Sequence, residues 1–264
     1  MKFLNHQIYT VVYISEKDVE TVQKNLNEDL ENIKNYFRDN DLVINLKRNK
    51  TECMLVGTAK RISTGPQQLN LFYDYTKIHA TMSYKYLGTY IDNHLSLGEN
   101  FEIKTKKAMS KLRLLARLKN MLTSDAAIAI YSSIITPTLK YNCIVQLKLT
   151  LTQQNRLIGI EKFAARTLNT KVNSIKDDFY KHAVKLFRKC VEGNTCSNFK
   201  NYFEVNHHSK STRNKGLFLK VPKVKLEFAK SGFFAMGVKL YNELPKEIRE
   251  TKLGFRQKLK TFNF

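Results

Sequence analysis

Apolar residues in the first third of the chain recur at two spacings, which separates short strands from one long helix. Residues 10–15 (TVVYIS) form a β-branched run and are predicted to be a strand. From 17 to 38 the apolar residues lie three or four positions apart, which marks one face of a helix. Residues 57–68 are predicted to be a loop. Further strand candidates cover residues 42–46, 51–56, 69–73, 77–79 and 84–91, the last with Gly88 at a bulge or a close backbone approach.

From residue 99 onward the apolar spacing is helical. Ser96 and Glu99 are predicted to form a capping box before the first of these helices, and Pro137 to close the second. The pattern weakens over residues 194–226, which are loop-like and basic. Helices are predicted over residues 99–121, 124–135, 152–168, 175–191 and 229–243.

This order of elements predicts an α+β protein of three parts. Residues 1–95 are strand-rich with one amphipathic helix, residues 96–192 are helical, and residues 193–264 form a basic C-terminal region. The chain has 264 residues, of which 42% are hydrophobic, so it can bury a core and is not a disordered basic tail.

The charge of the chain points to a polyanionic partner. Lys and Arg number 45 against 23 Asp and Glu, which gives a formal charge of +22. Phosphates contacted by such cations release condensed counterions, so RNA, DNA or their hybrid is the leading candidate partner. An anionic membrane is the rival, but the sequence shows no lipidation signal and no apolar run long enough to span a bilayer. We expect nucleic acid and no membrane, and the sequence carries no indication of an oligomeric state.

The N-terminus and the cysteines indicate an intracellular protein. His6, Gln7 and Tyr9 interrupt the apolar start of the chain, and no small-residue cleavage site follows, so no secretory signal is expected. The chain has 4 Cys, scattered along its length, as is usual in a reducing compartment. The expected location is the nucleus or the cytoplasm.

Two stretches concentrate cations without compensating acids. The predicted helix over 99–121 has no Asp or Glu after Glu102, and residues 206–225 have none at all. A solvated helix usually intersperses acids, so we favour phosphate contact over plain solvation for both stretches. The cations of the helix are Lys104, Lys106, Lys107, Lys111, Arg113, Arg117 and Lys119. The predicted phosphate contacts are Lys104, Lys107, Lys111, Arg113 and Arg117 on the helix, and Arg213 and Lys215 beyond it.

Motifs for enzyme chemistry are largely missing from the sequence. It has no phosphate-binding glycine loop, no HExxH, no nucleophile elbow and no paired CxxC. Cys190 and Cys196, followed by His207 and His208, are spaced more widely than zinc ligands, so buried thiols and surface imidazoles are the preferred interpretation. The Asp-Asp pair at 177 and 178 lacks the converging carboxylates of a two-metal site. No metal site is predicted.

Several short motifs are weak alone but specific in their order. TVVYIS at 10–15, DLVINLKRNKT at 41–51 and YKYLGTYID at 84–92 precede the basic helices, and YNELP follows at 241–245. This order resembles the C-terminal half of the reverse transcriptase, an RNA-directed DNA polymerase, of Jockey-like and related non-LTR retrotransposons (LINE elements). The similarity covers essentially residues 10–250.

The resemblance implies a role for most of these motifs. TVVYIS matches the palm strand that follows the catalytic turn, and Lys50 matches a lysine near the incoming nucleotide. YKYLGTYID, which contains Tyr86, Leu87 and Gly88, is similar to the primer-grip hairpin. The basic helices match the thumb, which tracks the template–primer backbone. YNELP resembles a C-terminal signature usually written Trp-Asn-x-Leu-Pro, with Tyr241 in place of Trp.

The resemblance also implies that this chain does not polymerise DNA. In the family two Asp precede the strand that TVVYIS matches, and this chain has Ile8 and Tyr9 there. Those carboxylates hold Mg²⁺ in the intact family, so no cofactor is expected here. The implied fold is a truncated palm remnant over 1–95, a thumb-like region over 96–192 and a basic region over 193–264. The expected function is nucleic-acid binding without catalysis.

Two other interpretations stay open. Upstream exons that encode the fingers and both Asp motifs would make this chain part of an active RNA-directed DNA polymerase. Alternatively the charge is incidental and the chain is a non-enzymatic interaction protein, which salt-insensitive behaviour and no retention of nucleic acid would favour.

Overall fold

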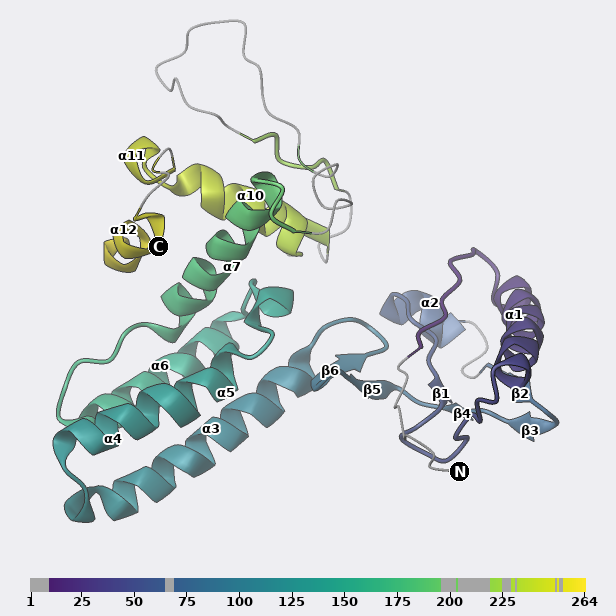
Figure 1. Ribbon diagram of the computed structural model, residues 1–264, viewed down its shortest axis with the longest axis horizontal. Helices are drawn as coiled ribbons and strands as arrows, with labels where there is room; N and C mark the ends of the chain where they lie inside the picture. Colours follow the sequence, from purple (N-terminus) through teal and green to yellow (C-terminus); the bar gives the residue numbers. More distant parts are fainter. Residues whose placement is uncertain are drawn as a thin grey trace, which may run out of the picture. The chain divides into compact units, whose positions relative to one another are not determined.

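Figure 1 shows the computed structural model of the chain, which is a mixed α+β protein as the sequence predicts. The chain divides into two compact units, Met1–Glu99 and Asn100–Phe264. Strands β1 to β6 all fall in the first unit, and the described elements of the second unit are helices. The structure describes residues 10–64, 69–195, 203, 219–224, 229–230, 232–249, 251 and 254–264.

Helix α1 (Val19–Asp39) confirms the amphipathic helix predicted over residues 17–38. It begins where Asp18 accepts a hydrogen bond from Thr21 N at 2.8 Å, because a short carboxylate satisfies an amide that has no partner within the helix. The apolar face of α1 covers a small core that contains Val22, Leu69, Leu71 and Ile78.

The strands of the first unit are short and form three separate two-stranded sheets. The parallel pair is β1 (Glu52–Cys53) with β4 (His79–Ala80). The antiparallel pairs are β2 (Phe72–Tyr73) with β3 (Thr76–Lys77), and β5 (Ser83–Tyr86) with β6 (Thr89–Asp92).

The prediction of one continuous strand over residues 84–91 is wrong, because the chain turns in the middle of it. Leu87 and Gly88 have φ angles of 45° and 79° and join β5 to β6. A two-residue turn with both φ angles positive matches the twist of the strands in a hairpin. Gly88 therefore serves the turn rather than a bulge.

Three other local predictions in the first unit are wrong. Residues 10–15 form no strand, and Tyr13 is 85% exposed. Residues 42–46 form no strand either. The predicted loop over 57–68 contains helix α2 (Ala59–Thr64). A β-branched run becomes a strand only where another strand accepts and donates its backbone hydrogen bonds, and the described residues supply none to these two segments.

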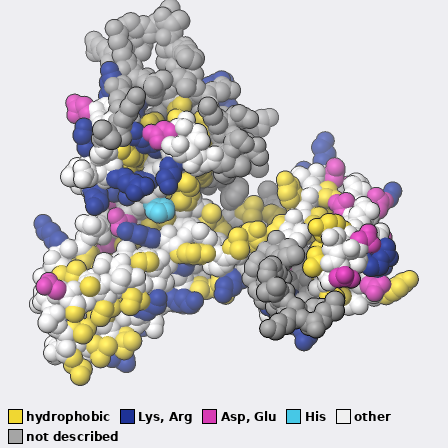
Figure 2. Space-filling view, viewed as in Figure 1, with side chains coloured by type: hydrophobic (Ala, Val, Ile, Leu, Met, Phe, Trp, Pro, Cys, Tyr) yellow, Lys and Arg dark blue, Asp and Glu magenta, His cyan; other side chains and the backbone are white. Residues whose placement is uncertain are grey.

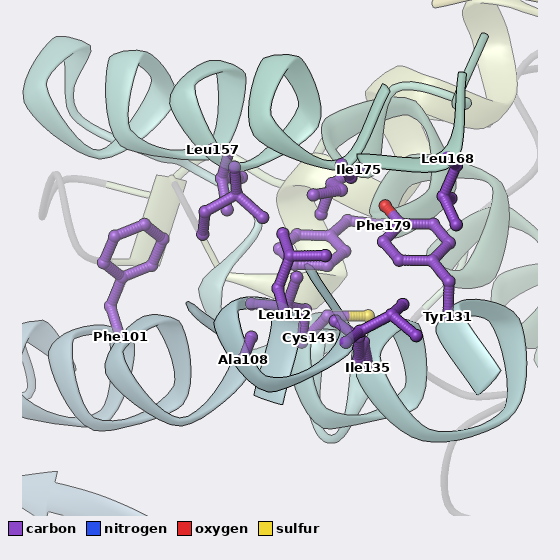
Figure 3. Close-up of a cluster of buried hydrophobic side chains, with 14 of the residues drawn as sticks. Phe101, Ala108, Leu112, Tyr131, Ile135, Cys143, Leu157, Leu168, Ile175 and Phe179 are labelled. Atoms are coloured by element: carbon purple, nitrogen blue, oxygen red, sulfur yellow. The ribbon is translucent and has the colours of Figure 1, made fainter. Parts of the chain in front are cut away.

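The second unit is built around a helical bundle, which confirms the helices predicted over residues 99–121, 124–135, 152–168 and 175–191. Figure 3 shows its core, where side chains from α3, η2, α6 and α7 meet. The elements are α3 (Gly98–Leu118), η1 (Lys119–Met121), α4 (Ser124–Ile130), η2 (Tyr131–Ile135), α5 (Thr136–Lys140), η3 (Cys143–Gln146), α6 (Leu151–Leu168) and α7 (Ile175–Val191).

Pro137 does not close its helix, contrary to prediction. The helix widens into the π-helical segment η2 and continues as α5, with Pro137 in the first turn of α5. Proline has no N–H and its ring conflicts with the carbonyl four residues earlier. A π-helical turn relieves that conflict because its hydrogen bonds span five residues rather than four.

The capping box predicted for Ser96 and Glu99 is not formed. Asp92 accepts a hydrogen bond from Ser96 N at 3.0 Å instead, so the amide that Glu99 would have bound is already paired. A capping box does open α6: Thr150 accepts from Gln153 N at 3.2 Å, and Gln153 accepts from Thr150 N at 3.0 Å.

The described residues beyond 218 belong to the second unit, where the helices over 233–243 and 255–261 contact α7. The helix predicted over 229–243 is confirmed by α10, which lies against α7 (Figure 1). The two helices lie close together at Gly237, where a Cβ atom would lie 2.7 Å from Phe187 Cδ2. The helices of this part are α10 (Phe233–Glu243), α11 (Lys246–Arg249) and α12 (Phe255–Thr261).

The YNELP signature has packing roles in this structure. The Asn242 side chain pairs with the backbone of Leu219: its Nδ2 donates to Leu219 O at 2.8 Å, and its Oδ1 accepts from Leu219 N at 3.2 Å. The Tyr241 ring lies 5.5 Å from the Phe187 ring, and Leu244 is buried. The motif therefore holds a distant segment and α10 against α7.

We predict that Gly237→Ala lowers the free energy of unfolding by about 1 to 2 kcal/mol, because overpacking at a fully buried ring outweighs the gain in helix propensity. Gly159→Ala on α6 is the matched control, since nothing lies within 4 Å of its Cβ position. The control should raise the free energy of unfolding by about 0.5 to 1 kcal/mol. Urea unfolding measures both, and equal effects would contradict the close contact at Phe187.

Candidate nucleic-acid interface

Helix α3 buries its apolar side in the bundle core and carries its cations on its other sides. Phe101, Ala108 and Leu112 are 5%, 0% and 0% exposed, and Figure 3 shows them directed toward side chains of α6 and α7. Glu102 anchors the same helix to α6, because Arg156 Nη1 donates to its two carboxylate oxygens at 2.6 and 2.7 Å. These contacts fix the rotation of α3 about its axis, and so decide which cations face outward.

Two of the predicted phosphate contacts are hydrogen-bonded to the bundle. Lys104 Nζ donates to Tyr141 O at 2.5 Å and lies 5.6 Å from the centre of the Tyr141 ring. Burial lowers the pKa of Lys104. Lys111 Nζ donates to Thr138 Oγ1 at 2.8 Å. Lys104 and Lys111 therefore already have partners in the bundle, and their predicted contact with phosphate stays a prediction.

A different set of α3 cations faces away from the core. Figure 2 shows Lys and Arg side chains along this helix. We call three of them the outward row: Lys106, Arg113 and Arg117. All three are exposed, and none has a hydrogen-bond or carboxylate partner among the residues that the structure describes. Lys107 is exposed as well.

The cations of the outward row lie along one side of α3. Positions 106, 113 and 117 are separated by seven and four residues, close to whole turns of an α-helix. They therefore share one face and extend over about 16 Å at 1.5 Å per residue. Arg113 and Arg117 are like charges four residues apart, a pairing that destabilises an isolated helix. An anion bound along this face would relieve that repulsion.

The candidate contacts in the first unit gather around the β5–β6 hairpin. Leu87 and Gly88 form its turn, and Leu87 is 53% exposed. Tyr86, at the end of β5, is half-buried. The Tyr84 hydroxyl donates to Lys50 O at 3.2 Å, so the structure brings the backbone of Lys50 to the hairpin. The Lys50 side chain is exposed.

Arg213 and Lys215 lie outside the described residues, as do Cys196, His207 and His208. Cys190 is 2% exposed, which fits the prediction of a buried thiol. Among the residues described, no group of three or more His, Cys, Asp and Glu side chains is placed to hold a metal ion. The described helices include none that is long and apolar enough to cross a membrane.

The Asp-Asp pair at 177 and 178 opens α7. Ser174 caps this helix by accepting from Asp177 N at 3.3 Å, and both acids lie in the first turn, where the helix dipole favours them. Asp178 also pairs with Lys140 Nζ at 2.5 Å. The partner of Asp178 thus comes from α5, which the spacing in sequence does not reveal.

Cys143 is a candidate for thiol chemistry because of its neighbours. Cys143 lines a small pocket with Lys104 and Gln146, and a lysine beside a cysteine can activate the thiol. Here burial raises the pKa of Cys143 to about 11, although the charge of Lys104 opposes that rise. At about pH 8 only about one thiol in a thousand would then be ionised.

We predict that Cys143 resists alkylation in the folded chain. With iodoacetamide at about pH 8, peptide-resolved mass spectrometry should show labelling slower by about a hundredfold or more than in urea, because the thiol is buried and protonated. Labelling of Cys143 in the folded chain as fast as in urea would instead indicate an activated, accessible thiol.

The comparisons with known proteins do not place this chain in a family. No family model, no curated protein and no solved structure matches it. The resemblance to reverse transcriptases of non-LTR elements therefore stays a prediction from the motifs in the sequence. The geometry of the described cations is a separate ground for assigning a function.

Proposed function

We propose that this chain binds the phosphate backbone of RNA, DNA or an RNA–DNA hybrid, and that the outward row of α3 is a principal contact. The observation that carries the proposal is an exposed line of like charges with no acid partner in the described part of the chain. Nucleic acid is the polyanion whose phosphates repeat along a line, as the cations do along this helix. The proposed origin is the reverse transcriptase of a non-LTR element.

Two considerations support phosphate contact over plain solvation. The excess of cations over acids extends to the whole chain, whose formal charge is +22. In addition, α3 carries its acids, Glu99 and Glu102, only near its beginning, and Glu102 is paired with Arg156. The rest of the helix therefore has no acid of its own to balance the row.

The proposed contacts are to phosphates, so little preference among base sequences is expected. Arg113 and Arg117 can each offer a planar guanidinium to two phosphate oxygens, while Lys106 offers a point charge. Lys104 and Lys111 are assigned a packing role because their ammonium groups already donate to the bundle.

We predict that an outward-row variant, which combines Lys106→Gln, Arg113→Gln and Arg117→Gln, binds a hybrid duplex less tightly and with a weaker dependence on salt. The slope of log affinity against log salt should become shallower by up to about 3, because each phosphate contact contributes about 0.7 to 0.9. Fluorescence anisotropy across a salt series measures the slope. Gln keeps the helix propensity nearly unchanged, and circular dichroism checks the fold.

The matched control removes the same number of charges elsewhere in the second unit. This scattered control variant combines Lys162→Gln, Lys171→Gln and Lys239→Gln, at three exposed positions on α6, after α6 and on α10. Its slope should change much less than that of the outward-row variant. Equal slopes for the two variants would mean that the outward row is a solvated face. Salt-insensitive binding by the parent chain would instead favour an interaction protein whose charge is incidental.

We also predict that the purified chain has no polymerase activity. Ile8 and Tyr9 stand where the resemblance requires carboxylates for two Mg²⁺ ions. Primer extension on poly(rA)/oligo(dT) with Mg²⁺ or Mn²⁺ should stay at background, while the same protein retains the template–primer on a filter. A template-dependent product from pure protein would overturn this part of the proposal.

A further inference from the structure

A second group of cations gathers where α5, α7 and α12 meet, away from the outward row. In Figure 2, Lys and Arg side chains lie beside a histidine over α7. We call this group the α7 cation cluster. Its members are Lys140 on α5, Lys181 and Lys185 on α7, and Arg256 and Lys260 on α12.

Apolar packing brings α12 to this position. Phe255 and Leu259 are 7% and 0% exposed, and they lie in one buried cluster with Ala183 and Val184 of α7. Arg256 and Lys260 follow these two residues directly and are exposed. Lys181 Nζ donates to Lys260 O at 2.9 Å, which joins the two helices at the cluster itself.

Two cations of the cluster have hydrogen-bond or ion-pair partners among the described residues, and three do not. Lys140 is paired with Asp178, and Lys181 is bonded to a backbone carbonyl. The side chains of Lys185, Arg256 and Lys260 have no hydrogen bond or ion pair among the described residues. These three cations come from two helices and are not balanced by an acid of their own.

The charges of the α7 cation cluster also bear on the pKa of Lys185. Burial lowers the pKa of Lys185, and the charges of Lys140, Arg256 and Lys260 lower it further, while Asp178 alone opposes them. Like charges held this close destabilise the folded chain unless an anion lies among them. The fold nevertheless brings them together from three elements.

We propose that Lys185, Arg256 and Lys260 form a second phosphate-binding site, which takes phosphodiester groups of the nucleic-acid backbone at the junction of α7 and α12. The inference rests on the proposed function and adds a site that the outward row does not include. The guanidinium of Arg256 matches two phosphate oxygens, and the two ammonium groups supply charge and further donors. A bound phosphodiester adds a negative charge beside Lys185, Arg256 and Lys260, whereas the nearby carboxylate of Asp178 is already paired with Lys140.

The first test uses a cluster variant that combines Lys185→Gln, Arg256→Gln and Lys260→Gln. These changes leave the Lys260 carbonyl and the Lys140–Asp178 pair in place. The free variant should melt at the same temperature as the parent chain or higher, because like charges are removed. Its slope of log affinity against log salt for a hybrid duplex should be shallower by about 2 to 3, whereas the scattered control variant changes much less.

The two proposals fail in distinguishable ways. If the parent chain shows no salt-dependent binding of the duplex, the proposed function fails. If the parent binds with a steep slope and the cluster variant matches both its affinity and its slope, only the second site is overturned. A cluster variant that melts well below the parent would also overturn it, because the cations would then stabilise the free chain.

The second test reads the site directly through His182, which is exposed on α7 next to the cluster. Partial burial of the ring and the charges of Lys185 and Lys140 lower the pKa of His182, while Asp178 opposes them. A bound phosphodiester favours the charged imidazole and should therefore raise that pKa. The pKa is measured by NMR with and without an oligonucleotide that has no terminal phosphate, and the His182→Gln variant identifies the resonance.

The oligonucleotide should raise the pKa of His182 in the parent chain by about half a unit or more and leave it unchanged in the cluster variant. Inorganic phosphate and polyglutamate are the comparison probes. A rise with inorganic phosphate but none with the oligonucleotide would overturn the backbone assignment. A rise of equal size with polyglutamate would overturn the assignment to phosphodiesters, because the site would then bind anions in general. No rise of the His182 pKa with any probe would overturn the second site itself.

Discussion

The contact between Phe187 and Gly237 is the constraint on which the C-terminal part of the second unit depends. Phe187 is fully buried, and only a residue without a Cβ atom lets α10 approach its ring so closely. Tyr241 packs on the same ring one helical turn later. Once α10 is fixed on α7, the chain returns through α11 so that Leu259 of α12 is buried beside Val184. The signature motif thus acts through packing.

The same packing concentrates positive charge at two places. The core side of α3 fixes its rotation, so Arg113 and Arg117 point outward without acids to balance them. The burial of α12 on α7 brings Arg256 toward Lys185, whose pKa is lowered mainly by burial and further by the charges of Lys140, Arg256 and Lys260. Both arrangements cost some stability in the free chain, and both would be stabilised by a phosphate backbone. That shared property links the two proposed sites to one partner.

The sequence predicted the helices well because their apolar spacing is a local signal, as for α7, whose bounds match the prediction. It failed for residues 10–15, because a strand also needs a partner that local propensity does not reveal. It identified the cations of α3 but not that Lys104 and Lys111 donate to the bundle. It could not show the α7 cation cluster, since nothing local indicates that Arg256 lies near α7.

The measurement that tests the central claim most directly is a lysine footprint of the chain with and without a hybrid duplex, read by mass spectrometry after brief acetylation. Lys106 and Lys185 should be acetylated in the free chain and protected by the duplex. Lys171 and Lys239, which are exposed elsewhere in the second unit, should be acetylated equally in both states. Acetylation of Lys106 and Lys185 unchanged by a bound duplex would contradict the account.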